Sequence, residues 1–257
     1  MKDNHIEILS FGGGPPSLAL SILNVTGDVM PKAEEIIFAD PGWENPDTYK
    51  LIPIYKKYFE SNGIPFVTVQ SPDGALHEYL QTHPNIPIPI YKTGGVLGQR
   101  QCTNQWKIQP IQKYLRTEHG VKTATVQLGM HYGEIWRLKE SRTKWVTNRY
   151  PLIDLKLNRA DCVQVIKEAN LPVPPPSACE FCPLKSDGKW RDLASNRPDE
   201  FAKVVELDDY LRERNKDLPV YLHWSRTPLK NRYSSDQMPM PLDDGDEGQC
   251  ESGYCFN

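Results

Sequence analysis

Three consecutive glycines near the start of the chain form its clearest chemical signal. They belong to the run Ser10-Phe11-Gly12-Gly13-Gly14-Pro15-Pro16-Ser17, set between a strand-like segment, Ile6 to Leu9, and a helix-like one, Leu18 to Leu23. Glycine lets the backbone turn sharply and approach an anion without Cβ interference, and the first N–H groups of the next helix point toward it. The run therefore predicts a phosphate-binding turn with a nucleotide as ligand. Similar turns occur without any ligand, and this one matches neither G-x-x-x-x-G-K-S/T nor G-x-G-x-x-G.

The cysteines supply a second signal. Cys179-Glu180-Phe181-Cys182-Pro183 has the C-x-x-C spacing that lets two thiolates reach one metal ion. Cys162 lies upstream on a predicted helix from Arg159 to Asn170, and Cys102 could supply a fourth ligand. Four such ligands would close a zinc site or hold an iron–sulfur cluster, and spacing alone does not separate the two. The alternatives are a redox pair or unrelated buried thiols. Cys250 and Cys255 form a wider pair for which a redox role, a metal role and no role all stay open.

Composition limits the class of protein. A chain of 257 residues can form one large domain, or a main domain with a small appendage. Its 39% hydrophobic and 25% charged residues are typical of a soluble globular protein. No apolar run approaches membrane-spanning length and the first residues lack a signal-peptide layout, so we expect a cytoplasmic location and no membrane partner. In that reducing compartment, six cysteines favour metal, redox or packing roles over disulfides.

The net charge argues against one class of ligand. A value of −3 is unlike that of a generally basic nucleic-acid-binding protein, although it allows a local basic patch such as Lys139 to Lys156. The six histidines have no ligand-like spacing, so each is interpreted as a surface or hydrogen-bonded core residue.

Alternating apolar strands and amphipathic helices predict the fold class. The expected strands are Ile6 to Ser10, Glu35 to Asp40, Phe66 to Gln70 and Thr125 to Gly129, and the expected helices are Ser17 to Asn24, Asp47 to Asn62 and Lys107 to Glu118. This order predicts an α/β, Rossmann-like fold with a largely parallel sheet flanked by helices. Ligands of such sheets bind beyond the carboxyl ends of the strands, where the glycine run and Asp40-Pro41-Gly42 would both emerge.

Three parts are expected along the chain. Residues 1–150 would form a nucleotide-binding α/β domain. The pattern after Tyr150 changes to helices separated by Pro-rich and Cys-bearing segments, so residues 151–233 would form a helical, Cys-rich, metal-binding part. Residues 234–257 read as a polar tail.

The order of these motifs resembles a known family. The glycine run, then Phe38 to Glu44, then Arg100-Gln101-Cys102-Thr103 and finally Cys179 to Pro183, is similar to the phosphoadenylylsulfate reductase-like branch of the adenine nucleotide α-hydrolase (PP-loop ATP pyrophosphatase) superfamily. Roughly residues 6 to 190 are covered, and the part from Tyr150 resembles uncharacterised, often phage- or mobile-element-associated members. The resemblance implies a HUP-type Rossmann-like fold.

The resemblance also implies site residues. Gly12, Gly13, Gly14, Pro15, Pro16 and Ser17 occupy the places of the phosphate-binding PP-loop, and Asp40 and Gly42 those of a second nucleotide-contacting turn. Pro16 replaces the usual Asp or Asn and Pro41 a common threonine, which weakens the expectation of Mg²⁺-assisted pyrophosphate chemistry.

Cations would have to offset the charge of the phosphates in such a site. Arg100, Lys107, Arg137 and Arg142 are the candidates, with Arg100 and Lys107 favoured because they flank Cys102. Ordinary surface charge is the alternative for each.

Three functions follow as hypotheses. The first is an iron–sulfur, ATP-dependent sulfurtransferase that adenylates an oxygen of tRNA, DNA or a small molecule and takes sulfur from a donor protein. The second is a reductase of a sulfonucleotide (PAPS or APS), with Cys250 or Cys255 as nucleophile. The third, suggested by Pro15, Pro16 and Pro41, is a non-catalytic nucleotide-binding protein in which a metal such as zinc is structural.

Overall fold

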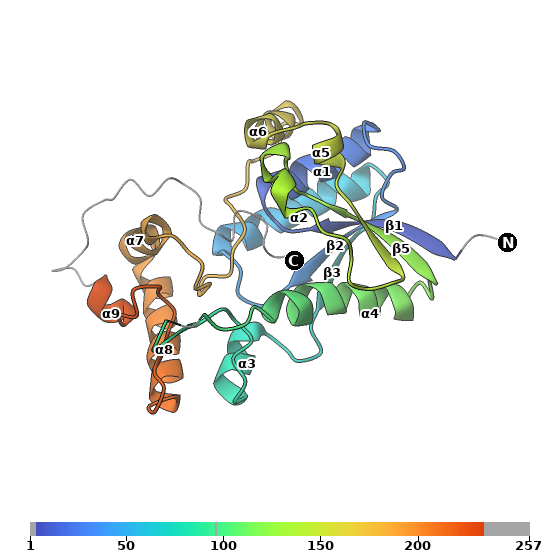
Figure 1. Cartoon of the computed structure of the whole chain (residues 1–257). Helices are drawn as coiled ribbons and strands as arrows, with labels where there is room; N and C mark the ends of the chain where they lie inside the picture. Colours follow the sequence, from blue (N-terminus) through green and yellow to red (C-terminus); the bar gives the residue numbers. More distant parts are fainter. Residues whose placement is uncertain (1–3, 96, 234–257) are drawn as a thin grey trace.

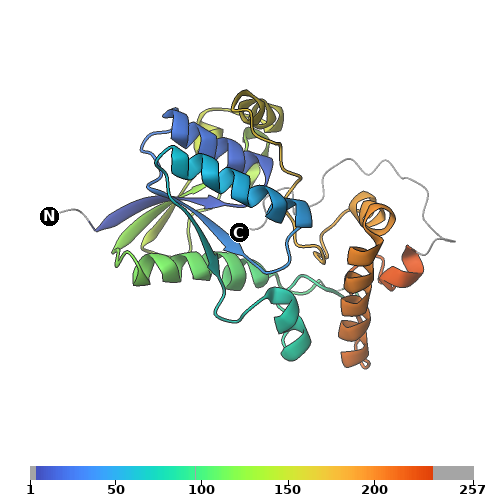
Figure 2. The same ribbon diagram turned by 180° about the vertical axis from the view of Figure 1, so that it is seen from behind.

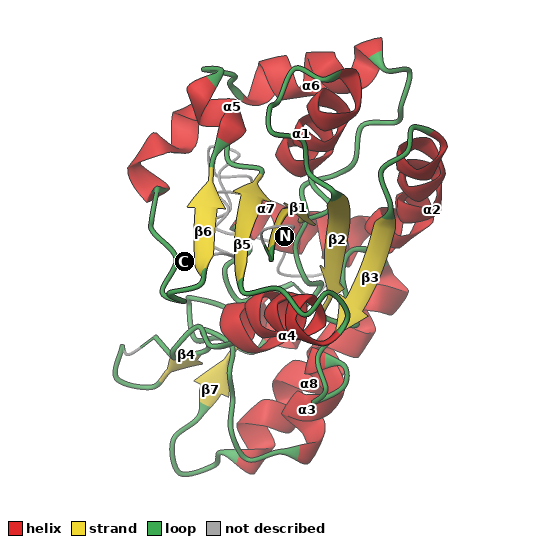
Figure 3. Ribbon diagram, turned by 90° about the vertical axis from the view of Figure 1, so that its right-hand side faces the viewer, coloured by secondary structure: helices red, strands yellow, loops and turns green. Residues whose placement is uncertain are grey.

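A five-stranded parallel sheet forms the centre of the molecule. The computed structural model describes residues 4–95 and 97–233. The strands are β1 (His5–Phe11), β2 (Glu35–Asp40), β3 (Phe66–Gln70), β5 (Thr123–Leu128) and β6 (Val146–Arg149), in the spatial order β3-β2-β1-β5-β6. Figure 3 shows them side by side. This confirms the predicted α/β, Rossmann-like fold class.

Helices cover both faces of the sheet (Figures 1 and 2). On one face α1 (Pro15–Thr26), α2 (Pro46–Ser61), α5 (Pro151–Asp154) and α6 (Arg159–Glu168) enclose a core that includes Leu9, Phe11 and Phe38. On the other face α4 (Gln109–Thr117) packs against the side chains that point the opposite way, among them Ile8 and Ile37. Side chains on both faces of β1 and β2 are therefore buried, as is typical of the central strands of a parallel sheet.

A second, smaller unit lies beyond the carboxyl ends of the strands (Figure 1). It contains α3 (Leu76–Thr82), α7 (Asp187–Asn196), α8 (Pro198–Arg214), α9 (Leu229–Arg232) and the antiparallel pair of β4 (Tyr91–Lys92) with β7 (Val220–Tyr221). Its core combines Leu76, Leu80 and Trp106 with Trp190 and Leu207. The unit is thus built from two separate stretches of sequence.

The expected boundary at residue 150 needs correction. Helices α5 and α6 follow that boundary, yet they belong to the main unit, because Leu152, Cys162 and Ile166 pack in the same core as α1. Helix α6 starts with a capping box in which the Asn158 side chain accepts hydrogen bonds from the amides of Ala160 and Asp161. The helical part of the chain therefore divides at about residue 171, after α6, between the two units.

Two short helices complete the described elements. A π-helix, η1 (Asn104–Ile108), leads directly into α4, and a 3-10 helix, η2 (Tyr132–Arg137), follows β5. Residues 4–95 and 97–233 include no helix with the length and apolarity needed to cross a bilayer.

Candidate functional site

The glycine run forms a turn between β1 and α1, as the sequence predicts. Gly14 is the N-cap of α1, no side chain caps the helix, and Gly13 has a φ of 84°. Pro15 and Pro16 occupy the first helical positions and have no N–H group. The backbone donors that this turn can offer an anion are therefore the amides of Gly12, Gly13, Gly14 and Ser17.

Neighbouring segments fix the position of this turn. A Cβ atom on Gly129, directly after β5, would lie 2.6 Å from the Cα and N atoms of Ser17, and one on Gly13 would lie 2.9 Å from Cγ2 of Thr48. The Ser17 hydroxyl donates to the Gly14 carbonyl at 2.9 Å. The turn lies at the switch point of the sheet: the chain leads from β1 to β2 on one side and from the adjacent β5 to β6 on the other, and this is the usual ligand position of such folds.

Asp40, at the end of β2, shapes the second loop. Its Oδ1 accepts hydrogen bonds from the Gly42 amide at 2.8 Å and the Tyr49 hydroxyl at 2.6 Å, and its Oδ2 from Gln70 Nε2 at 3.3 Å. Burial, followed by the hydrogen bond to Asp40, raises the pKa of Tyr49, so this hydroxyl stays a donor. Asp40 therefore holds the loop in shape through three neighbours.

Gly42 allows the second loop to reach the smaller unit. It has a φ of 91°, and a Cβ atom there would lie 2.4 Å from Cβ of Ala75. The carbonyl of Pro41 accepts a hydrogen bond from Leu76, the first residue of α3. The close contact between this loop and α3 therefore requires glycine at residue 42.

Glu44 is a buried residue of the candidate site, and the sequence does not reveal its burial. Its side chain is 0% exposed, and its Oε1 pairs with Lys107 Nζ at 3.1 Å. Its Oε2 accepts from Ser177 Oγ at 3.2 Å, and Cys179 Sγ lies 3.9 Å from Oε1. A β-bridge joins residues 44 and 179. Glu44 thus connects the loop after β2 with η1 and with the segment that carries the C-x-x-C pair.

Lys107 therefore differs from its expected role. From the sequence, its charge is expected to offset phosphates, whereas in the structure it pairs with the buried carboxylate of Glu44. Its own side chain is 12% exposed. Because an ion pair this sheltered is costly to break, Lys107 serves first to neutralise Glu44.

Ser177 lies beside the glycine turn without any sequence motif to indicate it. A Cβ atom on Gly14 would be 3.4 Å from the Ser177 backbone nitrogen, and one on Gly13 would be 3.7 Å from its hydroxyl oxygen. The segment before the C-x-x-C pair thus forms one wall of the turn.

Three of the four expected metal-ligating cysteines share one cavity. Cys102, Cys179 and Cys182 line a space of about 30 Å³ together with the apolar side chains of Trp106 and Phe181. A space of that size holds about two or three water-sized groups. Within the described ranges no group of three or more His, Cys, Asp or Glu side chains is placed to hold a metal ion.

Cys162 corrects the expected set of four ligands. It is fully buried in the core between α6 and α1, apart from the core on which Cys102 and Cys179 pack. Burial, with a smaller contribution from Asp161, raises the pKa of its thiol to about 12. A neutral thiol in an apolar core is a packing residue rather than a ligand. Cys250 and Cys255 lie outside the described residues.

The remaining cations lie in different environments. Arg137 is buried and paired with Glu134, one helical turn away, so it stabilises η2 rather than a ligand. Arg142 and Arg100 line a second, larger cavity between α4 and the segment 139–143, and Arg100 also borders the cysteine cavity. Lys107 also borders the cysteine cavity.

Comparison with known proteins gives matches among solved structures. No protein-family model and no curated protein sequence matches the chain. The structure of phosphoadenylyl-sulfate (PAPS) reductase from Candida auris, a phosphate complex, is similar at 17% identity and a TM-score of 0.44, over 65% of this chain and 74% of that one. The structure of the U34-tRNA thiolase NcsA from Methanococcus maripaludis, which carries a [4Fe-4S] cluster, is similar at 18% identity and a TM-score of 0.45, over 83% and 73%. Similarities of this size specify neither a ligand nor a reaction.

Proposed function

We propose that this chain is an adenine-nucleotide-dependent enzyme of the PP-loop type that serves sulfur transfer. The observation that carries the proposal is the turn from Gly12 to Ser17, which lies at the start of α1 and at the switch point of the sheet. The order of motifs that resembles the phosphoadenylylsulfate reductase-like branch supports adenine as the base. ATP is the proposed nucleotide, and a sulfonucleotide (PAPS or APS) the alternative.

The turn's amides would hold the phosphates and orient the α-phosphorus. An acceptor oxygen would attack that phosphorus, pyrophosphate would leave, and a sulfur donor would then displace AMP. Arg100, which borders both cavities, is the proposed catalytic cation that offsets phosphate charge. The acceptor is proposed to be tRNA, DNA or a small molecule, in a cytoplasmic setting.

The residues of the two loops do not fit Mg²⁺ well. Pro16 stands where the family has an acidic or amide side chain, and the carboxylate of Asp40 already accepts three hydrogen bonds. These facts favour a second candidate function, nucleotide binding without turnover. The reductase alternative depends on Cys250, which lies outside the described residues.

Nucleotide binding at the turn can be tested by titration calorimetry with ATP. We expect Gly12→Ala to weaken ATP binding at least tenfold while leaving the melting temperature within about two degrees, since its new Cβ would meet nothing closer than 3.7 Å. Gly13→Ala should lower both the affinity for ATP and the melting temperature. Alanine is strained at the positive φ of residue 13, and its Cβ would lie too close to Thr48.

Gly63→Ala is the matched control. Gly63 also has a positive φ, of 80°, but a Cβ atom there would meet nothing within 4 Å, so this variant carries the backbone strain without touching the turn. ATP affinity equal in wild type, Gly12→Ala and Gly13→Ala would contradict the proposal. Release of AMP and pyrophosphate with RNA, DNA or a small acceptor would separate the transferase from the non-catalytic alternative.

A further inference from the structure

A cavity of about 150 Å³ lies on the α4 side of the sheet. Its walls are the start of α4 with η1, the carboxyl half of β5, the strand β6 and the segment 139–143. None of the residues from Gly12 to Ser17 or from Asp40 to Gly42 lines it. The cavity is therefore a site distinct from the proposed phosphate-binding turn.

The floor of the cavity is apolar. It is lined by Ile108, Ile111, Val126, Leu128 and Val146, of which the last four are buried core residues. At about 10 to 15 Å³ for each water-sized group, the cavity has room for roughly ten non-hydrogen atoms. Such a floor suits a small flat or aliphatic group rather than a fully hydrated ion.

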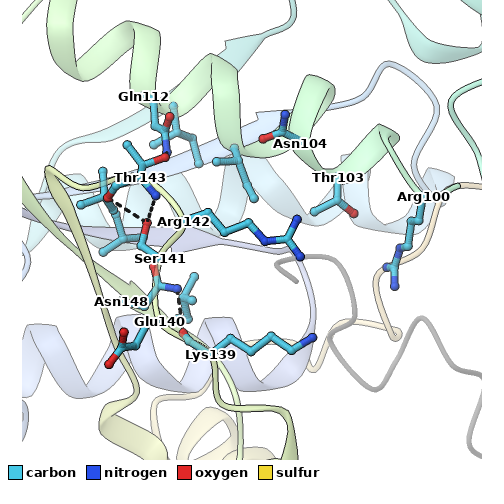
Figure 4. A pocket seen from close by; sticks show the side chains of 15 residues that line it. Arg100, Thr103, Asn104, Gln112, Lys139, Glu140, Ser141, Arg142, Thr143 and Asn148 are labelled. Atoms are coloured by element: carbon cyan, nitrogen blue, oxygen red, sulfur yellow. Dashed lines mark hydrogen bonds between the residues drawn. The ribbon is translucent and has the colours of Figure 1, made fainter.

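The open side of the cavity is cationic. Figure 4 shows Arg142 reaching across the cavity toward Thr103, with Lys139 and Arg100 on the same open side. The one acidic lining residue, Glu140, directs its carboxylate away from them. The described parts of the chain contain no hydrogen-bond or ion-pair partner for the Arg142 guanidinium or the Lys139 ammonium. Arg142 and Lys139 can therefore bind a ligand without first breaking an ion pair.

The wall that carries these cations is held in place by hydrogen bonds. Gln112 on α4 donates to the Thr143 hydroxyl at 3.0 Å, and the Thr143 amide donates to Ser141 Oγ at 3.1 Å. Asn148 Nδ2 donates to the Lys139 carbonyl at 3.1 Å. The segment 139–143 is thus joined to both α4 and β6, which preorganises the site.

The geometry points to this cavity as a binding site for a small organic oxyanion, a phosphate or sulfate group joined to a compact apolar body. The guanidinium of Arg142 and the ammonium of Lys139 bind the oxygens of the head. The apolar body lies on Ile108, Ile111 and Val126. This ligand is additional to the nucleotide, and the inference holds whether or not the glycine turn binds ATP.

Phenyl phosphate is a suitable probe, because its eleven non-hydrogen atoms match the roughly ten that the cavity holds. Titration calorimetry should show that phenyl phosphate binds at least tenfold more tightly than inorganic phosphate or phenol. Inorganic phosphate has only the charged head of the ligand, and phenol has only its apolar body. Arg142→Gln and Lys139→Gln should each weaken it about tenfold or more. Affinity should also fall as salt rises, because both cations are exposed.

Lys144→Gln is the matched control, since it removes one exposed positive charge from the neighbouring segment without altering the cavity lining. It should change the affinity less than twofold. Ile108→Asn should weaken phenyl phosphate but leave inorganic phosphate unchanged, and melting temperatures identify variants that fail to fold.

Three outcomes would overturn the inference. The first is no saturable binding of phenyl phosphate at millimolar concentration. The second is equal affinity in wild type and Arg142→Gln. The third is a loss of phenyl phosphate binding in Gly12→Ala as large as in Arg142→Gln, which would place the probe at the glycine turn.

Discussion

At the scale of single residues, burial rather than residue type decides what the cysteines and charged groups can do. Cys162 and Cys182 are both thiols, but the first is enclosed by the core between α1 and α6 while the second borders a cavity. Lys107 is a cation near the site, yet a buried carboxylate neutralises it. Two predictions belong to this scale.

Cys162 should resist alkylation. A thiol with a pKa of about 12 is ionised at pH 8 in about one molecule in ten thousand, and burial also blocks the reagent. Peptide mapping after iodoacetamide treatment should show Cys162 labelled at least a hundredfold more slowly than Cys182 in the native protein. Both should be labelled alike in guanidinium chloride, and equal native rates would contradict the assigned environment.

Glu44→Gln should destabilise the fold by about 3 kcal/mol, because it leaves the sheltered ammonium of Lys107 without its counter-charge. Urea unfolding measures the loss. The double variant Glu44→Gln with Lys107→Met should recover part of it, and Lys50→Met is the control, since Lys50 pairs with Asp47 at an exposed position. Strictly additive losses in the double variant would show that the pair does not interact.

At the scale of elements, close backbone contacts place the glycine turn. The end of β5 touches the start of α1 at Gly129 and Ser17, and the loop after β2 touches the start of α3 at Gly42 and Ala75. In both places glycine is needed because backbone, not a movable side chain, occupies the space of a Cβ atom.

Gly129→Ala should therefore cost about 1–3 kcal/mol and weaken ATP binding as well, because the new methyl group displaces Ser17 and with it the turn. Thermal unfolding and ATP titration measure the two effects. Gly120→Ala, at a positive φ of 58° with nothing within 4 Å of its Cβ, should cost only the strain of its backbone and keep ATP affinity. Unchanged ATP affinity in Gly129→Ala would show that the contact between Gly129 and Ser17 does not position the binding site.

At the scale of the whole molecule, the smaller unit depends on a buried polar network centred on Asp187. The Asp187 carboxylate accepts from His223 Nε2 at 2.7 Å, from Trp224 Nε1 at 2.9 Å and from Arg232 at 2.6 Å. Burial alone would raise its pKa, but the hydrogen bonds from Arg232, Trp224 and His223 outweigh it and lower the pKa to about 2. Burial lowers the pKa of His223 against the opposing effect of Asp187.

Both lowered pKa values make the folded state less stable as the pH falls. Each group binds its proton less readily when folded than when unfolded, so their contribution is complete at neutral pH. It is lost as pH falls, first below about 6.5 through His223 and then below about 4 through Asp187. Urea unfolding at pH 7.5, 5.5 and 3.5 should show a stepwise decrease. His223→Gln should flatten the first step, and a wild-type profile independent of pH would contradict this account.

Only part of the tertiary arrangement follows from patterns along the chain. Four strands were predictable to within about two residues, whereas β6, Val146–Arg149, was not, because three of its four side chains are polar and its partner β5 decides its pairing. The smaller unit joins residues 76–106 to residues 181–233 through side chains such as Trp106 and Phe181, and no local pattern predicts that pairing.

The α/β class and the position of the glycine turn can be predicted from the amino-acid sequence, because hydrophobic periodicity and glycine conformation are local properties. The resemblance to a family of nucleotide enzymes rests on the same local motifs. The folded structure alone shows that Cys162 lies apart from Cys102, Cys179 and Cys182, that Glu44 neutralises Lys107, and that Arg142 and Lys139 face an apolar cavity. Distance, burial and charge pairing depend on which distant segments meet, and those contacts exist only once the chain has folded.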